Sequence, residues 1–518
     1  MIAVWLLLAA CIGAAAGDEA EVHDIVLRGG TIHRGDGSQP LTGHVAISAG
    51  RIAVVTDGQA PRGEIELDCS GLVIAPGFID LHNHSDNPIL RRDTRANVNY
   101  LLQGCTTIVT GNCGGGKVDV AKYFETIDQQ GAGTHVAHLL PQGALRRSVM
   151  GSSRRDADES ELAKMLELAE QAMRDGAFGM STGLIYVPGT FTPTEELIAI
   201  ARVVAEHGGI YASHIRNEGA QLLDSIDEAV RIGRQAELPV HISHFKASGK
   251  ANWGTLRLAI ERIEAARREG LVVTADQYPY AASSTSLEAT LFPAWSRDGG
   301  RAALKRRLED PETADKIRDE LKRKLAASSR IQLVSCSDNR QWVGRSIQEV
   351  ADAEGIELVE LVVTIQRQGG ASVINFGMSE DDVRLAMPVP WVATASDGGA
   401  KVLSSSLPHP RSFGTFPRKL GRYALRDEVL SLAAAIRSSS SLPAEILGLD
   451  DRGRVAQGLV ADLIVFDPET FIDHATFDDP YLPPSGMRHV LVAGQPAVFA
   501  GQYTGVLAGQ ALRKSAGQ

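Results

Sequence analysis

The chain has 518 residues, of which 44 % are hydrophobic and 22 % are charged, a balance that supports a large buried core and excludes global disorder. Its 52 Lys and Arg against 63 Asp and Glu give a formal net charge of -11, which would repel a phosphate backbone, so we expect no nucleic-acid partner. This length fits roughly two to four ordinary domains, or one α/β barrel of about 250 residues or more with additions.

The amino-terminal segment, residues 1–17, is apolar and is followed by the acidic Asp18 and Glu19. We interpret it as a secretory signal peptide, since it is short for a membrane span. Leu8-Ala9-Ala10-Cys11 also has the form of a bacterial lipoprotein cleavage box, in which Cys11 would carry a lipid anchor. We therefore expect the protein to be exported, as a periplasmic, secreted or lipid-anchored protein. If this segment, which lacks Lys and Arg, is not a functional signal, the protein would be cytoplasmic.

The two ends of the remaining chain share one pattern. Apolar and polar residues alternate between glycine turns over residues 22–75, which predicts short antiparallel strands. The same pattern returns over residues 446–510, in GRVAQGLVADLIVFDP and HVLVAGQPAVFAG. Because both segments flank the rest of the chain, we predict that they pair into one small β-sandwich.

Residues 76–445 alternate apolar strands, polar or glycine loops and amphipathic helices, such as 159–174 and 219–235. Eight strands can be counted by their carboxyl-terminal ends: GFIDLHNHSD, TTIVTGNCGG, HVAHLLPQG, GAFGMSTGL, IYASHIRNEG, PVHISHFKASG, VVTADQYPY and WVATASDGG. Eight parallel strands close a (β/α)8 barrel, so the predicted fold is α/β, a TIM-like barrel with the small β-sandwich. An insertion at about 288–388 precedes the eighth strand, and its charge-dense part, 301–324, predicts solvated helices.

Candidate metal ligands follow several of these strands. His82 and His84 are two residues apart, so on a strand they would face the same side and could chelate one cation. Four further candidates end other strands: Cys113, His214, His244 and Asp397. Each alone is more often structural, but a barrel keeps its active site at the carboxyl ends of its strands, so we expect all six to converge there. Imidazoles, a thiolate and a carboxylate suit one or two divalent ions, with zinc first.

A divalent ion in such a site lowers the pKa of bound water and polarises a substrate carbonyl, which is the chemistry of amide hydrolysis. Asp397 is the natural proton shuttle, because a carboxylate beside this water can take its proton and deliver it to the leaving amine. Cys69 and Cys105 lack a strand-end position, and we expect them to be core thiols. Cys336 lies in the insertion, and we assign it no role. The odd number of cysteines predicts free thiols rather than a disulfide framework.

The segments GLVIAPGFIDLHNHSD, ASHIRNEG, ISHFKASG, TASDGG and GRVAQGLVADLIVFDP resemble the metal-dependent amidohydrolase superfamily. Within it, GNCGG together with STGLIYVPG, DQYPYAASST and HPRSFGTFPR is similar to the N-acyl-D-amino-acid deacylases, or D-aminoacylases, over about residues 24–510. The resemblance implies zinc-dependent hydrolysis of the amide bond of N-acyl-D-amino acids to a carboxylate and a free D-amino acid.

The resemblance also implies roles for the ligands, with the cysteine in place of the carbamylated lysine of most superfamily members. It assigns a tightly held zinc to Cys113, His214 and His244. It assigns a weaker metal site to His82, His84 and Asp397, with Asp397 as the catalytic acid/base.

The substrate-binding residues that the resemblance implies are Tyr186, Lys246, Tyr278, Ser284 and Arg411. Arg411 can hold a carboxylate with two parallel donors and Lys246 adds a point charge, while tyrosine and serine hydroxyls can orient carbonyl oxygens.

The sequence departs from the family pattern at one place. Relatives often carry G-H-G-x-L-R where this chain has residues 141–146, PQGALR, and we expect this change to affect acyl-group or side-chain preference more than metal chemistry.

Two alternatives stay open. The first is a related amidohydrolase acting on cyclic amides, like a hydantoinase or dihydropyrimidinase, or on dipeptides with a carboxyl-terminal D-residue. The second is an exported binding or metal-sequestering protein that kept the scaffold without catalysis, against which the proton shuttle Asp397 argues. The preferred D-side chain, the acyl length, the number of metal ions needed and the oligomeric state are not determined by these residues.

Overall fold

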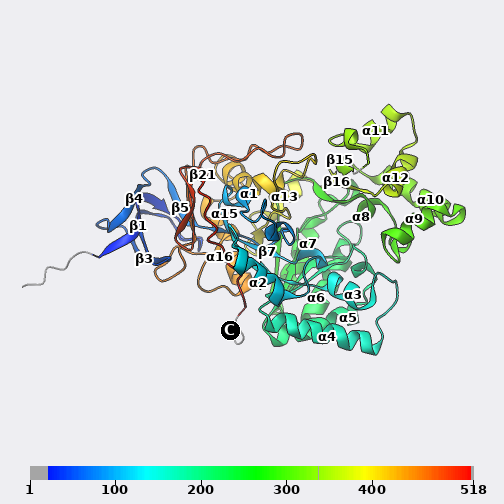
Figure 1. Cartoon of the computed structure of the whole chain (residues 1–518), viewed down its shortest axis with the longest axis horizontal. Coiled ribbons are helices and arrows are strands. Elements are labelled where there is room, and N and C mark those ends of the chain that lie inside the picture. Colours follow the sequence, from blue (N-terminus) through cyan, green and yellow to red (C-terminus); the bar gives the residue numbers. More distant parts are fainter. Residues whose placement is uncertain (1–20, 337, 515–518) are drawn as a thin grey trace, which may run out of the picture.

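The computed structural model describes residues 21–336 and 338–514 (Figure 1). The predicted signal peptide and Cys11 lie outside the described residues, so export and lipidation stay predictions. Among the residues described, no helix is both long enough and apolar enough to cross a membrane.

The two ends of the chain form one β domain, drawn in blue and red-brown at one end of the molecule in Figure 1. Its nine strands make one hydrogen-bonded sheet in the order β21-β20-β19-β18-β5-β1-β2-β3, with β4 paired to β1. The ends meet where β18 runs antiparallel to β5, as the shared pattern predicts. A separate apolar core, which includes Ile47, Ile74 and Leu463, holds the domain together. The strands are β1 Val22–Ile32, β2 Leu41–Ser48, β3 Arg51–Thr56, β4 Arg62–Asp68, β5 Val73–Pro76, β18 Leu463–Phe466, β19 Met487–Val492, β20 Gln495–Phe499 and β21 Gln502–Tyr503.

The eight predicted barrel strands are confirmed. One run of parallel pairs joins β6, β7 and β8, and a second joins β9, β10, β11, β12, β13 and β17. Only Leu139 separates β8 from β9, so these two short pieces form the third strand. The strands are β6 Phe78–Asp80, β7 Cys105–Thr110, β8 His135–His138, β9 Leu140–Pro141, β10 Gly179–Gly183, β11 Ile210–His214, β12 Val240–Ile242, β13 Val273–Gln277 and β17 Val392–Thr394.

Helices cover the outside of this barrel. Helix α4, Glu159–Arg174, has the predicted bounds and begins with a capping box formed by Asp158 and Glu161. Its buried residues Met165, Ala169, Ala172 and Met173 recur at helical spacing and join the main core. The predicted helix over 219–235 is α6, which begins at Leu222.

The other helices around the barrel are α1 Val98–Leu101, α2 Val120–Gln130, α3 Gln142–Met150, α5 Thr194–Glu206, α6 Leu222–Ala236, α7 Leu256–Arg268, α13 Glu380–Ala386, α14 Arg411–Pro417, α15 Leu432–Ser439 and α16 Ser441–Leu447. Short 3-10 turns are η1 Pro88–Leu90, η2 Asn112–Gly114, η3 Gly189–Phe191, η4 Lys250–Asn252, η5 Ala294–Arg297 and η6 Arg340–Trp342, and η7 Arg418–Ala424 is a π-helical segment.

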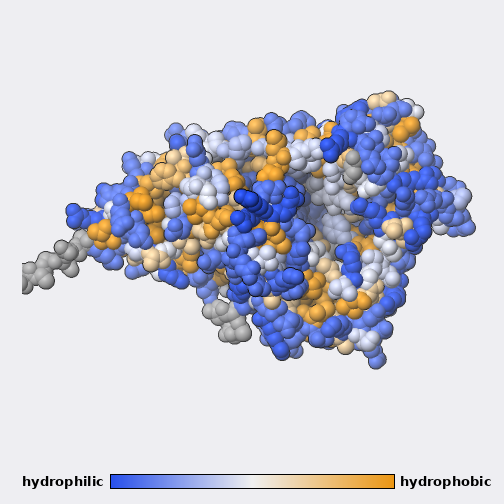
Figure 2. All heavy atoms as spheres, in the orientation of Figure 1, coloured by the Kyte–Doolittle hydropathy of each residue, from blue (hydrophilic) through white to orange (hydrophobic). Residues whose placement is uncertain are grey.

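The insertion forms a small unit of its own between β13 and β17, at the opposite end of the molecule from the β domain (Figure 1). Its three-stranded sheet and its separate apolar core extend from Ser283 to Asn375, whereas α13 packs its buried Val383 into the barrel core. The charge-dense stretch forms helices α9 and α10, as predicted. In Figure 2 the surface is hollowed between this insertion and the barrel. Its elements are β14 Ser283–Ser286, α8 Leu287–Leu291, α9 Arg301–Glu309, α10 Pro311–Ala327, β15 Ile331–Cys336, α11 Ile347–Glu354, α12 Leu358–Arg367 and β16 Ala371–Asn375.

The segments that follow the first and eighth barrel strands, β6 and β17, are joined by a parallel bridge of Asn83 with Gly398, with backbone hydrogen bonds from His84 to Gly398 at 2.7 Å and from Asp397 to His82 at 2.8 Å. Side chains reinforce this junction. The buried Asp80 ends β6, and its carboxylate accepts hydrogen bonds from the backbone N–H and the hydroxyl of Ser396, at 2.8 and 2.5 Å. Tyr100 Oη lies 2.8 Å from the same hydroxyl. Asp80 therefore fixes the start of the segment that carries Asp397.

We predict that Asp80→Ala lowers the free energy of unfolding by about 3 kcal/mol, because it leaves buried donors of Ser396 and Asn83 without an acceptor. Urea denaturation followed by circular dichroism measures the change. Asp68→Ala is the matched control, since Asp68 accepts the same kind of bonds from Ser70 on the exposed surface, and should stay within about 0.5 kcal/mol of wild type. Equal stability of the two variants would contradict the role of Asp80.

Candidate metal centre

The loop that follows β7 presents Cys113 to the mouth of the barrel. Cys113 lies in the turn η2 with φ of 53°, in the left-handed region that few side chains adopt. The backbone N–H of Gly111 donates to Asp86 at 2.7 Å, and the Asn112 side chain donates to the carbonyls of Val109 and Leu81 at 2.9 and 3.1 Å. These buried hydrogen bonds fix a loop that would otherwise be free to move, and so fix the direction of the sulfur.

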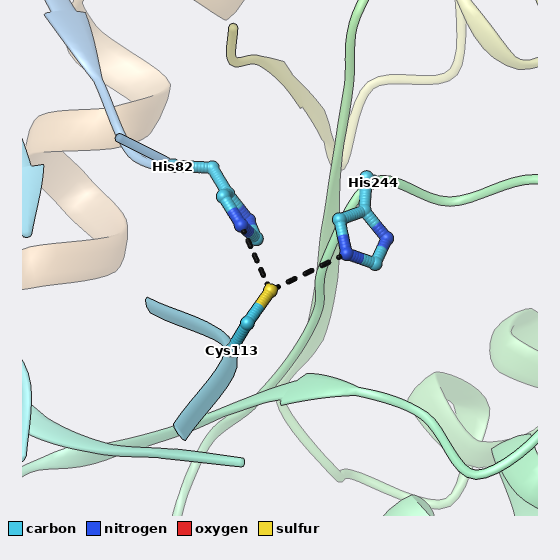
Figure 3. A group of neighbouring side chains, drawn as sticks. All are labelled: His82, Cys113 and His244. Carbon is cyan, nitrogen blue, oxygen red and sulfur yellow. Dashed lines mark hydrogen bonds between the residues drawn. The ribbon is translucent and has the colours of Figure 1, made fainter. Parts of the chain in front are cut away.

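Three imidazole nitrogens surround this sulfur. Cys113 Sγ lies 3.3 Å from Nε2 of His82, 3.6 Å from Nε2 of His244 and 3.7 Å from Nδ1 of His214. Figure 3 shows the sulfur between the rings of His82 and His244, which come from opposite sides. Residues from β11 and from the segments after β6, β7 and β12 thus meet at one atom.

A second group lies next to the first. His84 Nε2 is 3.0 Å and His82 Nε2 is 3.6 Å from Oδ1 of Asp397. The structure therefore brings all six predicted ligands to one mouth. The two histidines are not on a strand, because β6 ends at Asp80, so their convergence comes from the loop and not from strand alternation. Asp397 and His244 also have left-handed backbones, with φ of 50° and 39°.

Proximity groups these residues in three overlapping triads, in each of which the donor atoms lie within 4.8 Å of one another. The triads are His82, Cys113 and His244; His82, His84 and Asp397; and His214, Glu218 and His244. His82 and His244 each belong to two triads. The division into a tight and a weak metal site therefore stays a prediction.

Glu218 is a site residue that the sequence analysis missed. Its Oε1 lies 2.9 Å from Nδ1 of His244 and 2.5 Å from Nζ of Lys246, and its Oε2 lies 3.9 Å from Nε2 of His214. A carboxylate on the second nitrogen of an imidazole holds the ring and leaves the other nitrogen, here Nε2 of His244, free to face Cys113. The available signal was its spacing, four residues after His214.

Asp276 supports the cluster from behind. Its Oδ2 lies 2.9 Å from Nε2 of His241 and 3.5 Å from Nδ1 of His82, and its Oδ1 accepts the backbone N–H of His244 at 2.6 Å. Asp276 lies on β13, a strand that contributes none of the six predicted ligands. His241, which received no predicted role, therefore belongs to this supporting layer.

The cluster keeps its acidic groups ionised although it is buried. Burial opposes ionisation of Cys113, but His82 and hydrogen bonds with His214 and His244 hold the pKa of this thiol well below its ordinary value. Burial would raise the pKa of Asp397, but Arg411 and His82 hold it well below its ordinary value. Burial would lower the pKa of His84, but its contacts with Asp397 and Cys113 raise it to about 9. These shifts favour the thiolate of Cys113 and the carboxylate of Asp397.

These donors fit zinc. An ion about 2.3 Å from a thiolate and about 2.0 Å from imidazole nitrogens, at tetrahedral angles, sets sulfur–nitrogen separations of roughly 3.5 Å. The separations from Cys113 Sγ to His82 and His244, which form a triad with it, are 3.3 and 3.6 Å; His214 lies 3.7 Å from the sulfur but is not in that triad. The other nitrogen of His214, Nε2, is buried and has no hydrogen-bond partner within the described chain, although Oε2 of Glu218 lies 3.9 Å away. Carboxylate, imidazole and thiolate together favour a borderline-soft divalent ion.

A cavity of about 450 Å³ opens in front of this cluster. Its lining includes Cys113, His84 and Asp397 as well as the predicted substrate residues Tyr186, Ser284 and Arg411. Arg411 pairs with Oδ2 of Asp397 at 2.8 Å and donates to the backbone carbonyl of Ser284 at 3.2 Å. Its guanidinium also lies over the Tyr278 ring, 4.8 Å from the ring centroid, so Asp397, Ser284 and Tyr278 together hold its position.

Lys246 and Tyr278 lie behind the cavity and are not among its lining residues. The Lys246 ammonium contacts Glu218 at 2.5 Å and donates to the backbone carbonyl of His244 at 2.8 Å. Tyr278 stacks on Arg411 and its hydroxyl contacts Met378 at 3.5 Å. Both are arranged to support neighbours, so their direct contact with substrate stays a prediction.

His409 lines the cavity although the sequence analysis gave it no role. Burial and Arg411 hold the pKa of His409 well below its ordinary value, so the ring is neutral. Its Nδ1 accepts the backbone N–H of Arg411 at 3.0 Å, and its Nε2 donates to the carbonyl of Ala282 at 3.0 Å. His409 thereby fixes the start of α14, which carries Arg411.

The departure at residues 141–146 does not reach the cavity through Gln142. This side chain is fully buried and donates to Thr192 and Glu196, at 3.2 and 3.3 Å, in a network with Arg146. Of the residues of α3, only Gly143 and Arg147 line the cavity. The expected effect on substrate preference would therefore have to pass through the backbone of α3.

The other three cysteines of residues 21–336 and 338–514 are free thiols. Cys69 lies in the core of the β domain, Cys105 in the barrel core and Cys336 in the core of the insertion. Burial raises the pKa of Cys69 to about 12 and raises the pKa of Cys105 well above its ordinary value. The prediction of Cys69 and Cys105 as core thiols is confirmed.

Residues 66–498 match the model of an amidohydrolase family, Amidohydro_3. A D-aminoacylase of Alcaligenes xylosoxydans xylosoxydans is 34 % identical over 96 % of this chain and 99 % of its own length. An N-acyl-D-glutamate deacylase of the same organism is 34 % identical over 95 % of this chain and 97 % of its own length.

A solved structure has the same fold. It is an N-acyl-D-glutamate deacylase from Bordetella bronchiseptica, complexed with zinc and a phosphonate inhibitor that mimics the tetrahedral intermediate of the reaction. It superimposes with a TM-score of 0.83 at 30 % identity, covering 95 % of this chain and 100 % of the other.

We predict that iodoacetamide at neutral pH modifies Cys113 at least tenfold faster than Cys69, Cys105 or Cys336 in protein freed of metal by a chelator. The reason is that Cys113 is the half-buried thiolate while the others are buried thiols. Mass spectrometry of tryptic peptides measures each rate. Prior addition of zinc should protect Cys113 alone, and unprotected labelling would contradict a metal role for this sulfur.

We predict that Glu218→Gln weakens zinc binding by roughly 10–100-fold, because the carboxylate that orients His244 is lost. Competition with a chromophoric chelator measures the dissociation constant. Glu170→Gln is the matched control, since Glu170 holds His207 at 2.8 Å on the outer helices, away from the mouth. Zinc affinity that is the same in both variants would remove Glu218 from the supporting layer.

Proposed function

The chain belongs to the amidohydrolase family, and on this premise we propose that it is an N-acyl-D-amino-acid deacylase. It hydrolyses the amide bond of N-acyl-D-amino acids to a carboxylate and a free D-amino acid. One observation carries the proposal: a thiolate held among three imidazoles faces a cavity in which a carboxylate, Asp397, and a guanidinium, Arg411, lie side by side. This is a site for breaking an amide next to a carboxylate.

Zinc is the proposed metal. Its ligands would come from Cys113, His214, His244, His82, His84 and Asp397, with one tightly bound ion and room among the shared ligands for a second. When bound, such an ion lowers the pKa of water and polarises the substrate carbonyl. The donor set of this chain and the zinc in the related deacylase structure support this assignment.

Asp397 is the proposed general acid and base. Its low pKa means that the carboxylate is ionised and able to accept the proton of the attacking water. Both oxygens are held, Oδ1 by His84 at 3.0 Å and Oδ2 by Arg411 at 2.8 Å, so the proton acceptor has a fixed direction. The same carboxyl group then delivers its proton to the nitrogen of the leaving amine, which would otherwise depart as an unstable anion.

Arg411 is the proposed anchor of the substrate carboxylate. It is nearly fully buried, and its position is fixed by Tyr278, Ser284 and the His409 contact to its backbone. A buried guanidinium attracts one anionic group strongly although the whole chain carries a net charge of -11. Tyr186, whose hydroxyl contacts Thr285 at 3.0 Å, would face the acyl or amide part of the substrate.

The test is a panel of N-acetyl-D- and N-acetyl-L-amino acids, incubated with the zinc-loaded protein while amine release is followed. We expect hydrolysis of D-substrates at least 100-fold faster than of their L-enantiomers, since carboxylate, carbonyl and side chain must fit three fixed places. A hydantoin serves as the cyclic-amide control. Absence of stereoselective hydrolysis would refute the proposal, and faster opening of the hydantoin would favour a cyclic-amide hydrolase.

We predict that Asp397→Ala lowers kcat by roughly 10²–10⁴-fold, because the general acid and base is removed. The tightly bound zinc should remain, since Cys113, His214 and His244 are untouched, and metal analysis by inductively coupled plasma mass spectrometry checks this. Near-normal turnover with metal retained would exclude Asp397 from the proton transfers.

A further inference from the structure

The loop GNCGGG, residues 111–116, contains a glycine that its own backbone does not require. Gly111, Gly114 and Gly116 have φ of 80°, 67° and 141°, conformations that favour glycine. Gly115 instead has φ of -111° and ψ of 143°, an extended conformation that any residue adopts.

Packing does not require glycine at this position either. A Cβ atom on Gly114 would lie 3.0 Å from the backbone nitrogen of Gly183 and 3.1 Å from that of Gly143. A Cβ atom on Gly115 would meet only the carbonyl oxygen of Asn112, at 3.8 Å, which is ordinary van der Waals contact. Gly115, two residues after Cys113 in the chain, is exposed and lines the 450 Å³ cavity. The missing side chain therefore leaves free space in the cavity itself.

This space lies on one particular wall. Because Gly114 contacts Gly143 and Gly183, the loop belongs to the wall formed after β7, β9 and β10. Ser284 and Arg411 belong to another wall, formed after β13 and β17, where the substrate carboxylate would bind. A substrate whose carboxylate is at Arg411 and whose carbonyl is at the Cys113 cluster would extend its acyl group away from Arg411, toward Gly115.

We propose that Gly115 is the residue that sets how large an acyl group this protein accepts. The inference rests on the proposed deacylase function and names the substrate class within it: N-acyl-D-amino acids whose acyl group is larger than acetyl. A side chain at position 115 would take up the volume that the additional methylene groups or ring of the acyl group occupy.

The test compares wild type with Gly115→Ala and Gly115→Val on two substrate series. The first series varies the acyl group, as the acetyl, butyryl and benzoyl derivatives of the D-amino acid that is hydrolysed fastest as its N-acetyl form. The second keeps the acetyl group and varies the side chain from D-alanine to D-leucine and D-phenylalanine. Gly58→Val, in the turn between β3 and β4 of the β domain, is the control for an added side chain far from the cavity.

We expect Gly115→Val to lower the ratio of kcat/KM for butyryl over acetyl substrate at least tenfold, within the roughly 10–200-fold range of a steric change in an apolar pocket. Gly115→Ala should give a smaller fall, and Gly58→Val none. Because each ratio is internal to one protein sample, partial misfolding does not mimic the effect, and zinc content is measured for each variant.

Two results would overturn the inference while the proposed function stands: an unchanged acyl ratio in Gly115→Val, or a fall confined to the side-chain series, which would place the D-side chain at this wall. Failure of the wild type to hydrolyse any acetyl, butyryl or benzoyl derivative of a D-amino acid would overturn both.

Discussion

The site depends on one constraint, that a thiolate and several carboxylates can be buried together only if each is paired. Cys113 meets three imidazoles at 3.3 to 3.7 Å, and these rings are held in turn by Glu218 and Asp276. A charge left without its partner in such a place would be very costly, so the rings and the loop that carries Cys113 have little freedom. Left-handed backbones at Cys113, His244 and Asp397 are maintained within this arrangement.

The rest of the molecule brings these groups together and shapes the space before them. Asp80 ties the eighth strand to the first, and thereby fixes Asp397 beside His82. The insertion contributes Ser284 to the cavity from a sheet with a core of its own, while the site's Arg411 begins a helix that His409 holds in place. The candidate metal cluster belongs to the barrel, and part of one cavity wall belongs to the insertion.

Much of this could be predicted from the sequence. Eight apolar segments ending in polar or glycine loops indicated the barrel. Histidines, a cysteine and an aspartate near the carboxyl ends of those segments indicated that the site lies at the mouth of the barrel. Glu218, Asp276 and His409 could not be found in this way, because a supporting carboxylate or imidazole has no sequence signal of its own. Asp276 lies within a strand that supplies none of the six ligands, and its contact with His82 exists only because the fold places the end of β13 beside the segment that follows β6.

The amino-acid sequence by itself determined the alternation of strands and helices, the sharing of one β domain by both chain ends, and the donor types available for a metal. These follow from local periodicity and residue chemistry, which act over a few neighbouring positions. The tertiary structure alone decided which nitrogen of each imidazole faces Cys113, that Lys246 pairs with Glu218 behind the cavity, and that Gly115 leaves space within it. Those are relations between side chains far apart in the chain, and only the closed packing of the strand ends fixes their distances.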